Sequence, residues 1–255
     1  MRFKLCIIFS LFFLLFSLST ISSLEITEGR IKLVLHENYG RFSLYYLSNV
    51  RNDTYTPLFL DEDPRTSFLS VLEGNRSYRM GEAAGFSQSV QKTENGAEFV
   101  WKSNTLIIKE TFSFIRSADS GLANGVVLTA TAENISEQDL TIGMRFVIDT
   151  YIGENSATHF FTATNRGITG ETEFTQTTMP KFIMSAGEEL SGGFQIMTKG
   201  EGIKVPERLI LANWKRLNDT SWAYSTNSQR NFNQLPYSIN DSAIALYYES
   251  DRVAK

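Results

Sequence analysis

Apolar and polar residues alternate at a period of two along most of the chain, a pattern typical of half-buried β-strands. In the segment 30–36, Ile31, Leu33 and Leu35 share one face. The pattern recurs, with turn residues about every 8–15 positions, in the segments 41–48, 66–81, 87–103, 105–117, 125–134, 140–152, 181–186, 191–200, 207–214 and 242–250. No segment shows a sustained helical stripe, so the chain is predicted to form about a dozen strands.

Two of these segments contain hairpin signals. The segment 66–81 has Gly74 and Asn75 between two strand-like halves, and the segment 87–103 has Asn95 and Gly96 in the same place. Asn-Gly between alternating runs is the strongest short-range hairpin signal, because both residues tolerate a positive φ angle. We therefore expect antiparallel pairing of sequence neighbours at both places.

The alternation predicts an all-β fold, and we expect one large antiparallel β-sandwich over residues 23–255. About 230 residues are normal for one unit of this kind. The chain has 19 Phe and 13% aromatic residues, which suits thick packing between two sheets. Five prolines and the absence of low-complexity sequence leave no place for a linker.

The first 22 residues have the three parts of a secretory signal. Arg2 and Lys4 precede an apolar run from Leu5 to Leu18, and small polar residues follow it. We expect cleavage after Ser22 or Ser23; an uncleaved anchor is the alternative, although the run is shorter than the roughly 20 residues of a membrane span. The prediction is an exported protein, periplasmic or associated with the cell surface, that meets the membrane only through this segment.

Charge and cysteine content exclude several classes of function. The whole chain has 24 basic and 28 acidic residues, and without Arg2 and Lys4 the net charge is about −6 with no basic run, so nucleic-acid binding is not expected. Cys6, inside the signal, is the only cysteine, so a mature chain has no thiol ligand or disulfide.

No nucleotide-binding glycine loop and no histidine-pair spacing is present, so no cofactor or metal is predicted. The acidic run 61–66 is interpreted as a solvated turn rather than a calcium loop.

Four stretches, in the order in which they occur, resemble a family of exported bacterial β-sandwich domains of the kind found in spirochaetes. They are GMRFVIDTYIGEN at 143–155, ITGETEF at 168–174, ERLILANWKRL at 207–217 and NDSAIALYYE at 240–249. The fold of that family is similar to the supersandwich of galactose-mutarotase-like proteins, and the family has no assigned activity. Domains of this kind continue beyond the last stretch into another strand, so the resemblance implies that the strand at 240–249 lies at a sheet edge.

The most specific part of the resemblance, Arg145-x-x-x-Asp149, has two possible roles. On a strand, Met144, Phe146 and Ile148 share a core face, which places Arg145 and Asp149 on the opposite face. There an arginine can donate to backbone carbonyls at element ends, and an aspartate can cap a turn. We interpret the pair as structural.

An enzyme of the mutarotase type is one alternative, because it needs a general acid and a general base across a sugar ring. His159, Asp149 and Glu171 are the candidates, with Glu154 and Glu173 nearby in the sequence. A single histidine beside acids is a weak signal. If the protein is an enzyme, we expect His159 to gather in one concave site with at least two of Asp149, Glu154 and Glu171, one of them with a shifted pKa.

Binding of a glycan or of an envelope protein without catalysis is the interpretation we prefer. The polar stretch 218–238 mixes aromatic rings with amide side chains, as sugar-binding loops do. The candidate ligand contacts are Trp214, Trp222, Tyr224 and Arg145, with the rings expected to form an exposed platform. A purely structural role in an envelope or appendage assembly is the remaining alternative. The sequence does not specify an oligomeric state.

Overall fold

The computed structural model describes residues 23–59, 64–154, 156, 158–164, 167–187, 193–220 and 222–255. The expected signal segment and residues 61–63 of the acidic run lie outside the described residues. Across these ranges the chain forms sixteen strands, one α-helix of six residues and two short 3₁₀ helices. All pairings between these strands are antiparallel. The predicted all-β sandwich class is confirmed.

The elements follow one another along the chain in this order: β1 (Ser23–Glu28), β2 (Ile31–His36), β3 (Arg41–Asn49), β4 (Thr54–Pro57), η1 (Pro64–Thr66), β5 (Phe68–Glu73), β6 (Arg76–Arg79), β7 (Ser87–Thr93), β8 (Gly96–Lys102), β9 (Leu106–Arg116), β10 (Ala123–Asn134), β11 (Leu140–Asp149), η2 (Tyr151–Gly153), β12 (Thr172–Thr175), β13 (Phe182–Ala186), β14 (Gly193–Met197), β15 (Arg208–Asn213), α1 (Trp214–Asp219) and β16 (Ser242–Val253).

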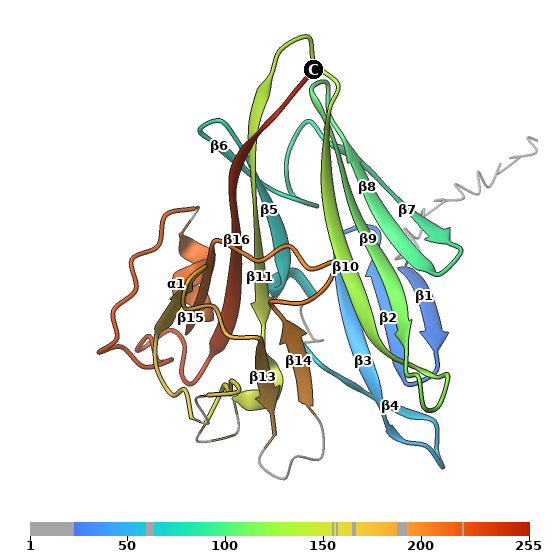
Figure 1. Cartoon of the computed structure of the whole chain (residues 1–255), viewed down its shortest axis with the longest axis vertical. Coiled ribbons are helices and arrows are strands. Elements are labelled where there is room, and N and C mark those ends of the chain that lie inside the picture. The colour runs from blue at the N-terminus through green and yellow to red at the C-terminus, as the bar shows by residue number, and fades with distance from the viewer. Residues whose placement is uncertain are drawn as a thin grey trace, which may run out of the picture.

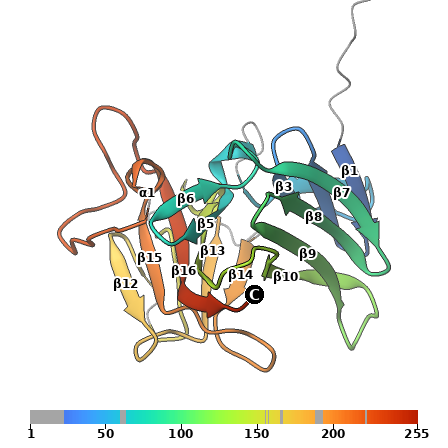
Figure 2. The ribbon, with the colours of Figure 1, turned by 90° about the horizontal axis from the view of Figure 1, so that it is seen from above.

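The strands are arranged in two layers (Figures 1 and 2). One layer is a six-stranded sheet with the order β12-β15-β16-β11-β5-β6. The other layer contains two four-stranded sheets, β10-β9-β8-β7 and β1-β2-β3-β4. These two sheets are joined where the Arg30 amide donates to the Ala123 carbonyl at 2.7 Å. The small β13-β14 hairpin accompanies the six-stranded layer.

A continuous apolar core fills the space between the layers because each strand presents its apolar face inward. On β9, Leu106, Ile108 and Phe112 are almost fully buried, while Lys109 between them is exposed. The core draws residues from both layers, among them Leu33, Leu35, Phe42, Phe99, Trp101, Val71, Phe146, Leu209, Leu211 and Ile244. On β11, Phe146 and Ile148 face this core with Met144 packed against it, as the sequence predicts.

The six-stranded sheet is also covered on its outer face, and this positions the site described below. Val147, Ala245 and Tyr247 belong to a second apolar cluster on that face. The cluster includes Leu217 of helix α1, so the helix closes over the sheet. In Figures 1 and 2 the helix and the long loop after it lie on the side of the molecule away from β7–β10.

Two local expectations need correction. The strand at 240–249 is not at an edge, because β16 pairs with β11 on one side and β15 on the other. Its residues alternate between the two apolar clusters, which is the pattern of a central strand with both faces covered. In the second hairpin the turn is Glu94-Asn95, since Gly96 already pairs with Thr93.

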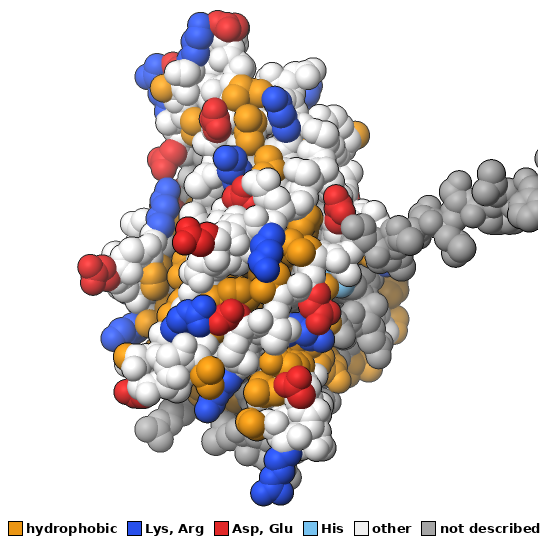
Figure 3. Space-filling model, turned by 90° about the vertical axis from the view of Figure 1, so that its right-hand side faces the viewer, with side chains coloured by type: hydrophobic (Ala, Val, Ile, Leu, Met, Phe, Trp, Pro, Cys, Tyr) orange, Lys and Arg blue, Asp and Glu red, His pale blue; other side chains and the backbone are white. Residues whose placement is uncertain are grey.

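The face opposite helix α1 is electrostatically mixed. Figure 3 shows the right-hand side of Figure 1, where lysine and arginine are interspersed with aspartate and glutamate among small apolar areas. Ion pairs on this side include Arg116 with Glu28. Within the described residues, no helix is long and apolar enough to cross a bilayer.

Candidate functional site

Helix α1 begins where Asn213 caps it, and the same side chain holds the following loop in place. Asn213 is fully buried, and its Oδ1 accepts a hydrogen bond from the Arg216 amide at 3.3 Å. Its Nδ2 lies 2.8 Å from the Phe232 carbonyl and 2.6 Å from Ser238 Oγ. The helix and the loop 222–241 are therefore fixed to each other by one amide group.

Arg145 holds the other end of the helix. This side chain is 1% exposed, and its Nη1 donates to the Thr220 carbonyl at 2.7 Å. Its Nη2 is 3.5 Å from the Leu217 carbonyl. Burial lowers the pKa of Arg145. The guanidinium thus satisfies carbonyls at an element end, as the structural interpretation expects. At 1% exposure it does not reach the surface, where the binding interpretation expects it to contact a ligand.

The three aromatic rings expected to form an exposed platform instead pack inward. Tyr224 is 8% exposed, and Trp214 and Trp222 are half-buried against the second apolar cluster. Trp222 meets the Tyr247 ring edge-on at a centroid distance of 5.8 Å, and Trp214 Nε1 donates to the Thr66 carbonyl at 2.8 Å. The rings attach the loop to the sheet because that buries more apolar surface than a solvent-facing platform would.

Glu171 does not join His159 and Asp149 but lies under the loop in an ion cluster. Its buried carboxylate accepts from Arg216 Nη1 at 2.8 Å and from the Tyr224 hydroxyl at 2.7 Å. The Asn227 amide donates to its other oxygen at 3.0 Å, and Arg230 Nη1 is 3.7 Å from that oxygen. This carboxylate is saturated with donors, so its role is to organise the loop.

Above this ion cluster lies an open, polar hollow of about 510 Å³. It is lined by Arg216, Asp219, Thr220, Ala223, Tyr224, Ser225, Arg230 and Gln234. Gln234 Oε1 is shielded from solvent and has no hydrogen-bond partner among the described residues. The Arg230 side chain is 45% exposed and makes, in the described part of the chain, only the long ion pair with Glu171. The residues around the hollow therefore include a shielded acceptor without a partner and a cation held by one long ion pair.

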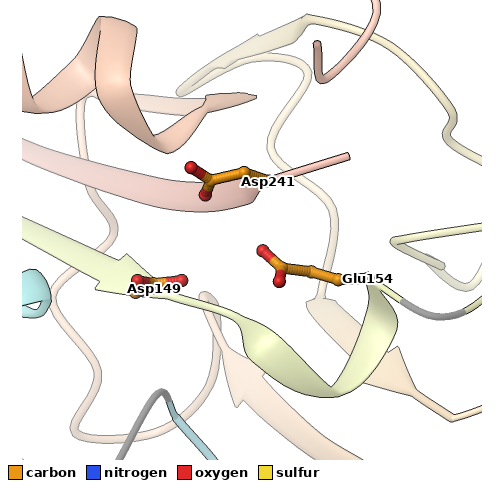
Figure 4. A group of neighbouring side chains, drawn as sticks. All are labelled: Asp149, Glu154 and Asp241. Carbon is orange, nitrogen blue, oxygen red and sulfur yellow. The ribbon is translucent and has the colours of Figure 1, made fainter. Parts of the chain in front are cut away.

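A carboxylate cluster forms at the end of β11 (Figure 4). Asp149, Glu154 and Asp241 point toward one another, with oxygens within 4.8 Å. Burial above all, and the charges of Asp149 and Asp241 to a smaller extent, raise the pKa of Glu154 to about 8, although the hydrogen bond from the Ser242 amide acts in the opposite direction. Burial also raises the pKa of Asp241. Like charges this close cannot all ionise without compensation.

The cluster could supply carboxylate oxygens to a hard cation such as Ca²⁺, which takes 6–8 oxygen ligands from carboxylates, carbonyls and waters. A proton on Glu154 relieves the repulsion at neutral pH, because its pKa lies near 8. Glu154 also accepts a hydrogen bond from the Ser242 amide at 3.0 Å.

His159 lies beside this cluster but is enclosed. It is 3% exposed, and its ring nitrogens lie 2.8 Å from Ser242 Oγ and 2.9 Å from Asn240 Oδ1. The Phe232 ring packs against it at a centroid distance of 4.6 Å, and burial lowers its pKa. His159, Asp149 and Glu154 are thus neighbours with one shifted carboxyl pKa, yet the histidine has both nitrogens engaged by neutral partners and is closed to a substrate.

Sequence reasoning missed most of the residues that line the hollow. Arg230 and Gln234 fall inside the polar stretch 218–238 but carry no motif, and Asn213 followed by helix-forming residues was an N-cap signal for α1. Asp241 is far from Asp149 in the sequence, so only the pairing of β16 with β11 brings them together.

Comparison with protein-family models gives no match, and comparison with curated proteins gives none either.

Proposed function

We propose that this protein is a non-enzymatic binding protein of the cell envelope and that it binds a glycan in the hollow beside helix α1. Export to the envelope is inferred from the N-terminal signal pattern. The observation that carries the proposal is the buried, unpartnered Oε1 of Gln234 in a polar hollow of about 510 Å³. A shielded acceptor without a donor is unfavourable by about 1–3 kcal/mol, and a sugar hydroxyl is a donor that relieves this.

The other lining groups support a sugar as ligand. Arg230, Thr220 and Ser225 offer hydrogen-bonding groups around the acceptor. The walls are held rigid by the Glu171 ion cluster and by Asn213, so little conformational entropy is lost on binding. The enclosed His159 favours binding over catalysis.

The test is isothermal titration of a panel of neutral and acidic oligosaccharides into the chain and two variants. Gln234→Leu removes the free acceptor and should weaken binding about tenfold. Because Oε1 has no partner to lose, this variant should be as stable as the parent. Arg230→Ala should weaken binding by a similar factor.

Arg116→Ala is the matched control, since Arg116 is an exposed arginine in an ion pair on the other layer. It should leave affinity unchanged. The absence of binding to every sugar, or binding that Gln234→Leu and Arg230→Ala do not alter, contradicts the proposal. Sugar turnover that is lost in His159→Ala would favour the mutarotase-type enzyme instead.

A further inference from the structure

A second pocket lies on the other side of helix α1. It has a volume of about 220 Å³ and is lined by Arg65, Thr66, Arg79, Glu82, Trp214 and Asn218. Trp214 and Asn218 are four residues apart and so share one face of the helix, whereas Arg216 and Thr220 of the hollow are on the opposite face. At about 30 Å³ per water molecule, the pocket has room for about seven waters, which is more than a bare anion needs.

In the part of the chain that the structure describes, arginine side chains gather around this pocket. Three guanidinium groups lie around the Phe68 ring. The distance from the guanidinium carbon to the ring centroid is 3.9 Å for Arg79, 5.7 Å for Arg145 and 6.0 Å for Arg41. Burial lowers the pKa of Arg41 to about 10, which leaves it charged at neutral pH. Cationic side chains this close repel one another unless anions compensate them.

Among the described residues, the nearby carboxylates only partly compensate these three cations. Glu82 contacts Arg41 Nη2 at 2.7 Å and lies 3.9 Å from Arg79 Nη1. Glu110 acts on Arg41 from the core, but burial raises the pKa of Glu110 to about 8, so it is mostly uncharged at pH 7. Asp219 pairs with Lys215 at 2.9 Å, and Arg79 acts on it only at longer range, as the last of the causes that lower its pKa. Arg145 donates to the backbone carbonyls of Thr220 and Leu217 and contacts the Tyr247 side chain, and none of these partners is a carboxylate.

Arg79 brings part of this charge to the pocket surface. It lines the pocket with 29% of its side chain exposed. Its Nη2 donates to the Asn218 carbonyl at 3.1 Å, which fixes the guanidinium and leaves other N–H groups of its five available. Trp214 forms a wall whose orientation is set by the bond from its Nε1 to Thr66. The Arg79 guanidinium can donate two hydrogen bonds to an oxyanion, and the Trp214 indole beside it can pack against the ring of a ligand that carries this oxyanion.

We propose that this pocket binds a small sugar that carries an oxyanion, a sugar acid or a sugar phosphate, with Arg79 contacting the oxyanion and Trp214 flanking the ring. The pocket does not share lining residues with the hollow, so this proposal stands independently of the proposed function.

The test is isothermal titration of the full chain with glucuronate, glucose 6-phosphate, glucose, acetate and inorganic phosphate at two salt concentrations. The charged sugars should bind, more weakly at high salt, and glucose should not. The tighter of the two charged sugars identifies the source of the oxyanion. Equal binding of glucose overturns the assignment, and acetate or phosphate matching the charged sugars overturns the role of Trp214.

Two variants of opposite expected effect keep the test independent of folding defects. Arg79→Gln should weaken the charged sugars about tenfold or more. Glu82→Gln retains an acceptor for Arg41 but removes the nearby negative charge, so it should tighten binding by about 3–10-fold. Arg116→Gln is the control and should change nothing. Folded variants of Arg79 and Glu82 that both bind like the parent overturn the proposal.

Discussion

At the scale of single residues, the polar side chains that the sequence marks as candidates for chemistry mostly hold the structure together. Arg145 bonds the carbonyls at the end of α1, and Glu171 is saturated by donors under the loop. The strand pattern correctly places Arg145 and Asp149 on the face opposite Phe146. It could not reveal their partners, because Thr220 and Asp241 come from distant segments whose positions depend on the whole fold.

Arg145→Met should destabilise the protein by about 2–4 kcal/mol, because two carbonyls in a covered region lose their charged donor. The measurement is the free energy of unfolding from urea titration. Arg116→Ala, which breaks an exposed ion pair, should cost less than about 1 kcal/mol. Equal effects of the two substitutions would show that Arg145 does not support the helix.

Glu110 makes stability depend on pH. It faces the core from β9 and is 2% exposed, and its Oε1 has no hydrogen-bond partner among the described residues. Burial raises its pKa from 4.5 to about 8, which Arg41 opposes only in part. Between pH 4.5 and 8 the folded chain therefore keeps a proton that the unfolded chain releases. Glu110 therefore makes the free energy of unfolding largest at low pH, and this contribution is lost as the pH rises from 4.5 to 8.

Glu110→Gln mimics the protonated side chain and should remove this contribution. The variant should gain a few kcal/mol in unfolding free energy relative to the parent at pH 8.5 and little at pH 4.5. Urea titrations across this range measure the difference. A difference between variant and parent that stays constant with pH would contradict the assignment of this slope to Glu110.

At the scale of elements, sequence reasoning succeeds where the signal is local. The Gly74-Asn75 hairpin forms as predicted because its turn needs a positive φ angle, which Gly74 supplies at +57°. The short elements β12 and α1 were missed, since four to six residues carry too little periodicity and such elements are stable only through tertiary packing. The central position of β16 agrees with its run of small and large apolar residues, Ala243, Ile244, Ala245 and Leu246, all of which are buried.

Asn213→Ala should destabilise the α1 unit by about 2–4 kcal/mol, because the helix loses its cap and the Phe232 and Asp241 carbonyls lose a donor. Since the same amide holds the loop, the hollow should also bind sugars more weakly. Lys215→Ala on the same helix breaks an exposed pair with Asp219 and a 5.9 Å contact with the Tyr237 ring, and it should cost less than about 1 kcal/mol. Urea titration compares them, and similar losses would argue against the cap.

At the scale of the whole molecule, the two faces of the sandwich have different characters. The outer face of β7–β10 and β1–β4 carries mixed charges, whereas the α1 side gathers arginines and both pockets. In a simple β-sandwich the outer face of each sheet is open to solvent, whereas here a helix and a loop cover the outer face of the six-stranded sheet. The class of fold could be predicted from alternation alone, but the covering layer could not, because its residues read as an ordinary polar loop.

The central claim is that the hollow beside α1 binds a glycan. The most direct measurement is retention of the purified chain on polysaccharide isolated from its native envelope, with bound proteins and sugars identified. The account predicts that the parent and Arg116→Ala are retained on the polysaccharide, and that Gln234→Leu passes through while remaining as stable as the parent. Equal retention of Gln234→Leu, or retention only through a stoichiometric protein partner, would contradict it.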